Sequence, residues 1–245
     1  MSGPDFSPVA ERYVRARPTY PDALFEWLAN EAPALDVAWD CATGSGQAAQ
    51  SLAARFAHVI ATDVSRAQLQ HAPAHERILY AASSAELAPL ASSSISLVTV
   101  AAAVHWFDID GFAREVRRVL RPGGVLAAWT YHVGRAEPPV GPVLGRFYDD
   151  VVGSYFHPRA RLVDERYEGI HLPGTPLIAP SVFASVRWDL QRTLEFVRTW
   201  SGTEVLRRRT GRDPVEDLAP EVAAVWGDAP ERELRFPLYL LVNRL

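Results

Sequence analysis

The chain carries at residues 37–47 the sequence Val37-Ala38-Trp39-Asp40-Cys41-Ala42-Thr43-Gly44-Ser45-Gly46-Gln47. Its apolar start and its two glycines predict a buried strand, a tight turn and then a helix over residues 47–55. Glycines one residue apart let a backbone come close to a ligand, and the helix that follows points unpaired N–H groups at that ligand. The pattern predicts a nucleotide-cofactor loop, although an ordinary strand-to-helix turn can contain the same glycines.

A second apolar run, at residues 59–62, ends at Asp63. An α/β unit of this length places a carboxylate where it can accept hydrogen bonds from the two hydroxyls of a ribose. The alternative is that Asp63 caps the helix that starts near Ser65. The two roles can coexist.

The residues around the turn bear on which nucleotide is bound. The stretch from Gly44 to Ala49 fits the Gly-x-Gly-x-x-Gly/Ala pattern of dinucleotide binders, which keeps a nicotinamide-dependent oxidoreductase open as an alternative. Asp40 stands just before the turn, however, and its negative charge would repel a pyrophosphate and suit an ammonium group. S-adenosylmethionine has an amino-acid end, a sulfonium and a ribose, and it has no phosphate.

The loop resembles the first motif of class I S-adenosylmethionine-dependent methyltransferases, Asp-x-Gly-x-Gly-x-Gly, with Asp40, Gly44 and Gly46 in place and Ala42 at the first glycine. Further matches are the segment 83–89, which resembles the family's adenine segment, and the helix-to-turn segment 108–124. Ser96 stands where the family usually has an aspartate. The resemblance implies the cofactor S-adenosylmethionine, with S-adenosylhomocysteine as product. It implies these cofactor-binding residues: Tyr13, Arg17, Asp40, Ala42, Gly44, Gly46, Asp63, Val64, Ser84, Ala85 and Ala101.

Within that family the segments 6–21, 104–107 and 199–201 resemble the small-molecule branch of trans-aconitate methyltransferase-like proteins, also called methyltransferase type 11. Tyr13 and Arg17 are four residues apart on a predicted helix and share a face. The resemblance implies a lid in which Arg17 holds the cofactor carboxylate and Tyr13 closes over it. The alternative is a surface helix whose arginine faces water. A third functional class is a protein that binds the cofactor as a regulator without catalysis.

Composition further narrows the functional classes to which the protein can belong. The chain has 245 residues, 48% of them hydrophobic and 22% charged, and a net charge of −4, which disfavours nucleic acid as a partner. It has no lysine, which excludes Schiff-base, pyridoxal phosphate and Walker-type chemistry. The single cysteine, Cys41, allows no disulfide and no Cys-x-x-Cys metal site. No membrane span or signal peptide is expected, so the expected location is the cytoplasm. The alanine- and arginine-rich composition suggests a bacterial source.

The alternation of apolar strands and helical segments predicts an α/β fold, namely a doubly wound, mainly parallel seven-stranded sheet with helices on both faces and a helical cap insertion. Strands are expected at residues 37–40, 59–62, 78–82, 95–101, 125–131, 183–190 and 234–242. One domain spans the chain. Its predicted parts are the N-terminal lid helices 1–33, the cofactor-binding core 34–134, the substrate cap 135–180, and the C-terminal strands and helices 181–245. The alternative is that residues 135–180 are a structural or dimer-forming insertion and do not cover a substrate.

The expected reaction is in-line displacement at the methyl carbon of the cofactor by a small-molecule acceptor. We expect a monomer or homodimer and no metal ion. His105 lies just past the fourth predicted strand and is the candidate for removing a proton or orienting the acceptor. A structural histidine is the alternative. The predicted pocket is aromatic and comprises Trp106, Trp129, Tyr131, Tyr155 and Trp200. For Trp129 and Tyr131 the alternative is packing against a helix.

Overall fold

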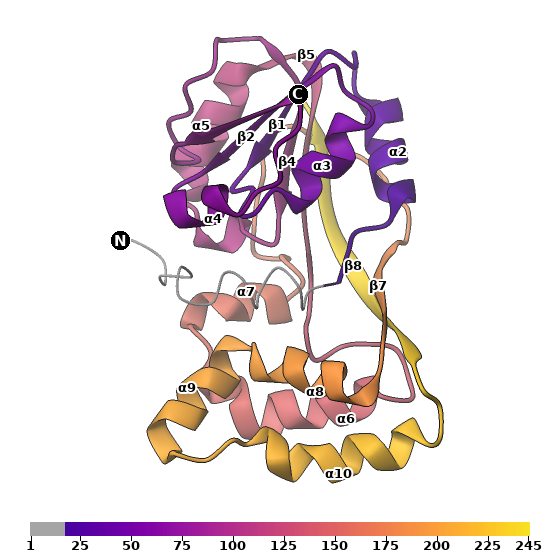
Figure 1. Cartoon of the computed structure of the whole chain (residues 1–245). Helices are drawn as coiled ribbons and strands as arrows, with labels where there is room; N and C mark the ends of the chain where they lie inside the picture. The colour runs from indigo at the N-terminus through magenta and orange to yellow at the C-terminus, as the bar shows by residue number, and fades with distance from the viewer. Residues whose placement is uncertain (1–17) are drawn as a thin grey trace.

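The computed structural model describes residues 18–245, which form an upper α/β lobe and a lower helical lobe (Figure 1). The strand order is β3-β2-β1-β4-β5-β8-β6, with β7 also paired to β8. Strands β1 to β5 are parallel, and β8 runs antiparallel to β5, β6 and β7. The strands are β1 (Val37–Cys41), β2 (His58–Asp63), β3 (Ile78–Ala82), β4 (Ile95–Ala101), β5 (Leu120–Tyr131), β6 (Thr175–Pro176), β7 (Phe183–Trp188) and β8 (Arg232–Arg244). This confirms the predicted doubly wound, mainly parallel sheet.

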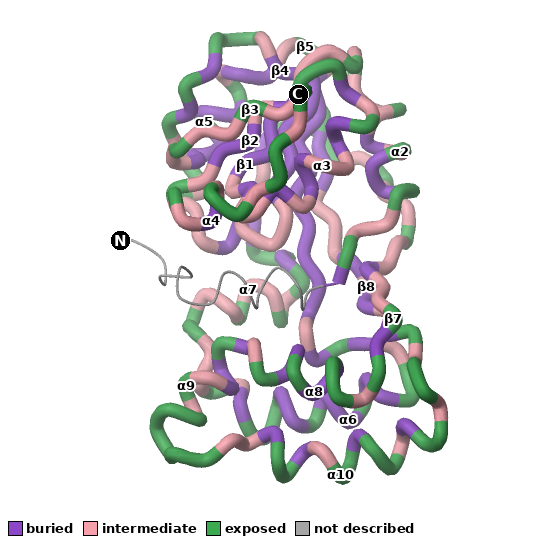
Figure 2. Tube along the Cα trace, in the orientation of Figure 1, coloured by how far each residue is buried: buried purple, intermediate pink, exposed green. Residues whose placement is uncertain are grey.

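Helices cover both faces of the sheet because successive strand side chains point to opposite sides. On one face α2 (Asp22–Glu31) and α3 (Gln47–Ala53) pack in the same core as Ala38 of β1. On the other face α5 (Ile109–Val119) packs in a second core with Trp39, the next residue of β1. Figure 2 shows the strands as the buried centre of this lobe. A shorter helix, α4 (Arg66–Gln70), follows β2, and the one-turn helix η2 (Val104–Trp106) follows β4.

The lower lobe is built from two segments of the chain. The first, after β5, contains α6 (Gly141–Arg146), η3 (Phe147–Val152), η4 (Gly153–Tyr155), η5 (Pro158–Ala160) and α7 (Arg161–Asp164). The second, between β7 and β8, adds α8 (Leu190–Arg198), α9 (Ser201–Thr210) and α10 (Val215–Trp226). The apolar side chains of α6 and η3 are buried with those of α8 and α10, in a core continuous with that of the upper lobe, whereas Leu162, Val163 and Tyr167 pack in the second core, with α5. The helical lobe therefore draws on residues 190–226 in addition to the predicted cap 135–180 (Figure 1).

Several element boundaries differ from the predictions for local reasons. The helix predicted over residues 47–55 ends at Ala53, and β7 ends at Trp188 because Asp189 caps α8 by accepting a hydrogen bond from the Arg192 N–H at 2.7 Å. The segment 120–124, predicted as a turn, is the start of β5, with a register shift against β4. The two-residue strand β6 was not predicted. In the described part of the chain no helix is long and apolar enough to cross a membrane.

A cluster of polar groups, in which Ser96 is fully buried and Asp36 is half-exposed, fixes the amino edge of the sheet. Ser96 of β4 donates a hydrogen bond to the Asp36 carboxylate at 2.6 Å, and Arg121 of β5 forms an ion pair with the same carboxylate at 2.7 Å. Asp36 also accepts from the Val37 N–H at 2.8 Å. A carboxylate is thus present beside Ser96, supplied by the residue before β1, and it ties three strands together at the edge opposite the glycine turn.

Candidate active site

Four loops meet at the carboxyl edge of the parallel strands, which is where open α/β sheets bind ligands. They follow β1 (residues 42–46), β2 (63–65), β3 (83–88) and β4 (102–107). All the predicted cofactor residues from Asp40 to Ala101 lie in these loops or at the strand ends that lead into them. Tyr13 and Arg17 lie outside the described residues. The first described residue, Pro18, accepts a hydrogen bond from Gln47 Nε2 at 3.1 Å, so the chain enters the structure beside the glycine turn.

The two glycines of the turn are required for different reasons. Both have left-handed backbones, with φ of +58° at Gly44 and +85° at Gly46. A Cβ on Gly46 would lie 2.5 Å from the Tyr80 hydroxyl, and together with the φ of +85° this contact within the protein favours glycine there. A Cβ on Gly44 would meet nothing within 4 Å. Gly44 therefore borders open space, and a ligand can approach its backbone closely.

Ala42 keeps the conformation of the glycine that it replaces. Its φ is +55°, in the left-handed region that a residue with a Cβ adopts at a cost of about 1–2 kcal/mol. The Thr43 N–H donates to the Thr62 carbonyl at 2.9 Å and anchors the backbone just after it. The loop therefore has the shape expected for three glycines, with one position held under strain.

Asp40, in β1, contacts this loop through its side chain. The side chain is fully buried, and its carboxylate accepts hydrogen bonds from the hydroxyls of Thr43 at 2.5 Å and Thr99 at 2.7 Å. Burial raises the pKa of Asp40 to about 6, an effect that these hydrogen bonds oppose. The carboxylate thus joins the loop to β4. Its predicted contact with the ammonium of the cofactor stays a prediction.

Asp63 connects the first two loops. One carboxylate oxygen accepts from the Gly44 N–H and the other from the Ser65 N–H, both at 2.8 Å. Burial raises the pKa of Asp63. The N-cap of α4 is Ser65, whose Oγ accepts from the Gln68 N–H at 3.3 Å, so the alternative that Asp63 is the cap is wrong. The Val64 N–H also faces this carboxylate. A carboxylate has about four lone-pair sites, so acceptor capacity remains for a ribose hydroxyl.

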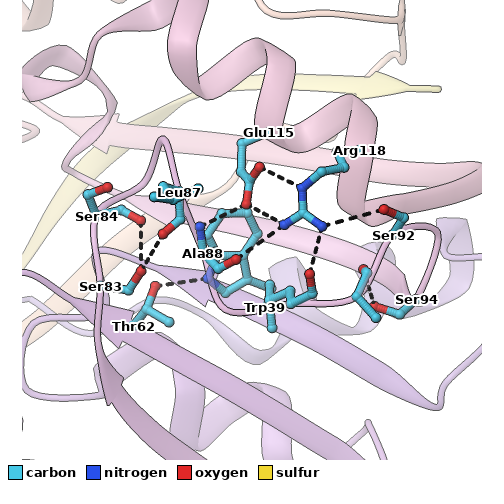
Figure 3. Close-up of polar contacts among 12 residues, drawn as sticks. Trp39, Thr62, Ser83, Ser84, Leu87, Ala88, Ser92, Ser94, Glu115 and Arg118 are labelled. Atoms are coloured by element: carbon cyan, nitrogen blue, oxygen red, sulfur yellow. Dashed lines mark hydrogen bonds and ion pairs between the residues drawn. The ribbon is translucent and has the colours of Figure 1, made fainter.

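The loop after β3 is held rigidly on the α5 side (Figure 3). The Glu115 carboxylate accepts from the Ala88 N–H at 2.8 Å, and Arg118 donates to the Leu90 carbonyl at 2.7 Å. The Ser83 hydroxyl closes the turn by donating to the Leu87 carbonyl at 2.8 Å. These contacts fix the segment that carries the predicted adenine residues Ser84 and Ala85.

Two apolar side chains beside these loops remain open to solvent. Val64, directly after Asp63, is 75% exposed, and Leu87, in the loop after β3, is 77% exposed. Both side chains stand beside the loops that carry the predicted cofactor residues, where a ligand could cover them. Val64 is one of the predicted cofactor residues, whereas Leu87 was not predicted, because nothing in the sequence separates it from an ordinary buried leucine.

His105 lies in η2, just past β4, and is 8% exposed. Its Nδ1 lies 2.9 Å from the Tyr167 hydroxyl. Burial, with the nearby charges of Arg159 and His157, lowers the pKa of His105 to about 4, so the imidazole is neutral at pH 7. Arg159 also donates to the Trp106 carbonyl at 2.5 Å, which attaches η5 to this loop. Sequence reasoning missed Tyr167 and Arg159, which lie in the cap far from His105 in sequence.

The predicted aromatic pocket residues separate into two groups. Trp106 is half-buried, and its ring lies 4.8 Å from that of His105 and 5.0 Å from that of His157. Tyr155 is also half-buried, with the Arg209 guanidinium 5.9 Å from its ring. The other three residues are buried in packing contacts: Trp129 against Tyr20 and Phe25, Tyr131 against Phe236, and Trp200 against Phe147, Phe196 and Tyr148.

Trp129 is the clearest correction to the predicted pocket. It is fully buried, and Phe25, one of its ring partners, belongs to α2, so it packs on a helix as the alternative proposed. Tyr131 and Trp200, 5% and 1% exposed, are likewise core side chains. Among residues 18–245 no group of three or more His, Cys, Asp or Glu side chains is placed to hold a metal ion.

An α/β fold with a left-handed glycine turn after β1 and a carboxylate at the end of β2 has the arrangement of a nucleotide-cofactor site. Comparison with known proteins agrees. Residues 39–128 match the family model described as "Methyltransferase domain". A solved structure named "Putative Type II Methyltransferase", from Anaeromyxobacter dehalogenans, is 41% identical with a TM-score of 0.86, and the match covers 93% of this chain and 97% of that one.

Two sequence relatives carry related names. A "Putative methyltransferase" of Dictyostelium discoideum is 26% identical over 98% of this chain and 94% of its own length. A malonyl-[acyl-carrier protein] O-methyltransferase of Dechloromonas aromatica is 37% identical over 51% of this chain, which spans half of that relative's length. The chain belongs to the class I S-adenosylmethionine-dependent methyltransferases and is an enzyme. This decides against the nicotinamide-dependent alternative, while the trans-aconitate-like subtype stays a prediction.

Proposed function

We propose that this enzyme transfers the methyl group of S-adenosylmethionine to a small-molecule acceptor. The observation that carries the proposal is the left-handed Gly44 beside open space, joined through its N–H to the Asp63 carboxylate. This glycine has no steric neighbour in the described residues, so a close-lying ligand explains it better than packing does. The helical lobe on the acceptor side and the net charge of −4 favour a small acceptor over nucleic acid.

The residues present fit the cofactor. Asp63 would accept hydrogen bonds from the ribose hydroxyls, and the backbone at Gly44 and Gly46 would face the amino-acid end. Val64 and Leu87 offer apolar surface to the adenine, and both are largely exposed. Ser84 Oγ and the Ala85 N–H would meet the polar edge of the base. In the same proposal Arg17 holds the carboxylate of the cofactor and Tyr13 covers it.

When bound, the cofactor supplies an electrophilic methyl group on a sulfonium leaving group. The enzyme then has to hold the acceptor in line with that methyl group, which can provide up to about 7–11 kcal/mol of the acceleration. His105 would take the proton of an acceptor O–H or N–H at Nε2. A weak base suffices for this, because the proton becomes acidic as the nucleophile forms its bond to carbon. Trp106 would provide an apolar wall beside that imidazole.

A matched pair of glycine variants tests the proposed cofactor site. Gly211, at the C-terminal end of α9, has φ +73°, and a Cβ there would likewise meet nothing within 4 Å, but it lies in the helical lobe. Gly44→Val and Gly211→Val should therefore suffer similar backbone strain, about 1–3 kcal/mol each. We expect Gly44→Val alone to abolish binding of S-adenosylhomocysteine by calorimetry.

Normal binding by a folded Gly44→Val variant would remove the main support for the site. Two further measurements extend the test to the reaction. Heat denaturation of the purified enzyme should release S-adenosylhomocysteine or S-adenosylmethionine, identified by chromatography and mass. A panel of small-molecule acceptors with a radiolabelled methyl donor should then show transfer, and transfer only to protein or nucleic acid would contradict the proposed acceptor class.

A further inference from the structure

The one-turn helix η2 ends in carbonyl groups that the helix itself cannot satisfy. The Trp106 N–H donates back to the Ala103 carbonyl at 2.9 Å, within the turn. The last carbonyls of any helix have no later N–H of that helix to accept from, and in a helix of one turn these are most of its carbonyls. Arginine side chains commonly bind such groups. A guanidinium at this end would fix the backbone that carries His105 and Trp106.

Arg159, in η5, provides this guanidinium. Its Nη1 donates to the Trp106 carbonyl at 2.5 Å, and the same nitrogen lies 3.4 Å from the carbonyls of the residues on either side, His105 and Phe107. Within residues 18–245 the side chain of Arg159 forms no ion pair with a carboxylate. The end of η2 is therefore the partner that determines where this half-buried guanidinium lies.

Arg159 belongs to a part of the chain that has an anchor of its own. This cap segment, residues 157–167, begins with η5 and continues through α7. Asp164 of α7 accepts hydrogen bonds from His132 Nε2 and from the Tyr148 hydroxyl, each at 2.8 Å. These contacts tie the segment to the residue after β5 and to η3. A segment ordered in this way can position the groups that its side chains bind.

The predicted adenine segment binds the loop after β4 from the other side. The Glu86 carboxylate, in that segment, accepts from the Asp108 N–H at 3.1 Å, just past the end of η2. On the cap side Arg159 holds the backbone of the loop, and the ring of His105 contacts the Tyr167 hydroxyl at 2.9 Å. The loop after β4 is thus held between the loop after β3 and the cap segment.

We infer that Arg159 is a positioning residue for methyl transfer, which fastens the loop after β4 to the cap segment and so determines where His105 and Trp106 lie relative to the cofactor loops. The inference rests on the proposed function for the role of those two side chains. Arg159 acts through the backbone of Trp106 and is assigned no contact with cofactor or acceptor. Without it the cap segment would keep its anchor at Asp164, but η2 would lose the partner of its carbonyls.

The protonation of His105 reports whether Arg159 is in place. Burial is the largest cause of the lowered pKa of His105, and the charges of Arg159 and His157 lower it further. The Tyr167 hydroxyl, which also faces the imidazole, is uncharged at neutral pH because burial raises its pKa. Loss of the Arg159 charge should therefore raise the pKa of His105, whereas a general loss of stability should not.

Proton NMR titration and hydrogen exchange of the full chain test the inference without cofactor or acceptor. The His105 signals are identified by their loss in His105→Gln. Arg159→Met removes the guanidinium and keeps an apolar stem, so the pKa of His105 should rise by at least about 0.5. Exchange over residues 104–108 should become at least about fivefold faster. The control is Arg161→Met, which removes an exposed arginine of the same segment, paired with Glu165 at 2.6 Å, and should change neither quantity.

An unchanged pKa of His105, or unchanged exchange over residues 104–108, in a folded Arg159→Met variant would overturn the inference. The same effects in Arg161→Met would overturn it too, because any lost charge on the cap segment would then suffice. If Arg159→Met does not fold, Arg159→Gln keeps one N–H₂ donor without the charge and should raise the pKa of His105 in the same direction.

Binding and turnover separate this inference from the proposed function. By calorimetry Arg159→Met should bind S-adenosylhomocysteine within about threefold of the wild type, and a larger loss would make Arg159 a cofactor-binding residue and overturn its positioning role. A wild-type enzyme that does not bind S-adenosylhomocysteine would overturn the proposed function alone. With an acceptor in hand, Arg159→Met should lower kcat at least about tenfold with little change in KM for the cofactor, and an unchanged kcat would overturn the inference.

Discussion

Replacing Asp63 with alanine should separate the loss of a cofactor contact from the loss of fold stability. In the structure the carboxylate holds the Gly44 and Ser65 N–H groups, each at 2.8 Å. Hydrogen bonds to a charged group contribute about 1.5–3 kcal/mol each, and solvent reaches this half-buried site and replaces part of them. We expect the free energy of unfolding to fall by about 2 kcal/mol.

The affinity for the cofactor should fall as well, because the variant also lacks the proposed acceptor for the ribose hydroxyls. A loss of about 1.5–3 kcal/mol corresponds to a Kd for S-adenosylhomocysteine raised roughly 10- to 150-fold, which calorimetry measures easily. The matched control is Asp36→Ala. Its carboxylate also ties a backbone N–H to neighbouring strands, but at the opposite edge of the sheet, so it should cost stability and leave Kd unchanged.

An unchanged Kd in a folded Asp63→Ala variant would refute this reasoning. It would mean that the carboxylate only joins two loops and that the ribose lies elsewhere. Equal losses of affinity in the Asp63 and Asp36 variants would also contradict it, because a general loosening of the sheet would then explain both.

Three other predictions follow from strain, burial and the N-terminal segment. Ala42→Gly should raise the free energy of unfolding by about 0.5–1 kcal/mol, since relief of left-handed strain exceeds the added chain entropy; urea denaturation showing a loss would contradict it. The pKa of His105 is about 4 in the folded protein and about 6.5 in the unfolded chain, so the free energy of unfolding falls by about 3 kcal/mol as the pH falls from 6.5 to 4. The pKa of Asp40 is raised from 3.8 to about 6, so the free energy of unfolding falls by about 3 kcal/mol as the pH rises from 3.8 to 6. The two effects should nearly cancel in the wild type. On acidification, His105→Gln should therefore gain stability relative to the wild type and Asp40→Asn should lose it. Stability–pH curves of the variants that run parallel to that of the wild type would refute these two pKa shifts. Deleting residues 1–17 should leave a folded core that binds S-adenosylhomocysteine at least tenfold more weakly, and full affinity would move the carboxylate contact away from Arg17.

The sheet could be predicted from the sequence because its signals are local. The apolar runs of β1, β2 and β4 each exceed the minimum for a buried strand, and the glycine turn fixes where the first strand ends. The same holds for Asp63, whose place at a strand end follows from counting residues. The boundaries of α3 and β7 were less predictable, because a helix or strand end depends on which neighbour satisfies the free backbone groups.

The acceptor side could not be predicted in the same way. Trp129 stands at a strand end among polar loops, as a pocket residue would, but α2 covers it from a distant part of the chain. Tyr167 has no recognisable motif around it and reaches His105 only through the fold of the cap segment. Their roles depend on which segments meet in space, and the spacing of residues in one sequence does not determine that.

The two sides of the site therefore differ in how the protein builds them. On the cofactor side, backbone N–H groups and a carboxylate from consecutive strand ends give a geometry that any sequence with the same short turns would reproduce. On the proposed acceptor side, His105 contacts Tyr167 of the cap segment, and Asp164 ties that segment to the residue after β5 and to η3. A change in the cap segment can thus alter the surroundings of His105, the proposed base, without touching the proposed cofactor loops. This arrangement lets the acceptor change while the donor site stays the same.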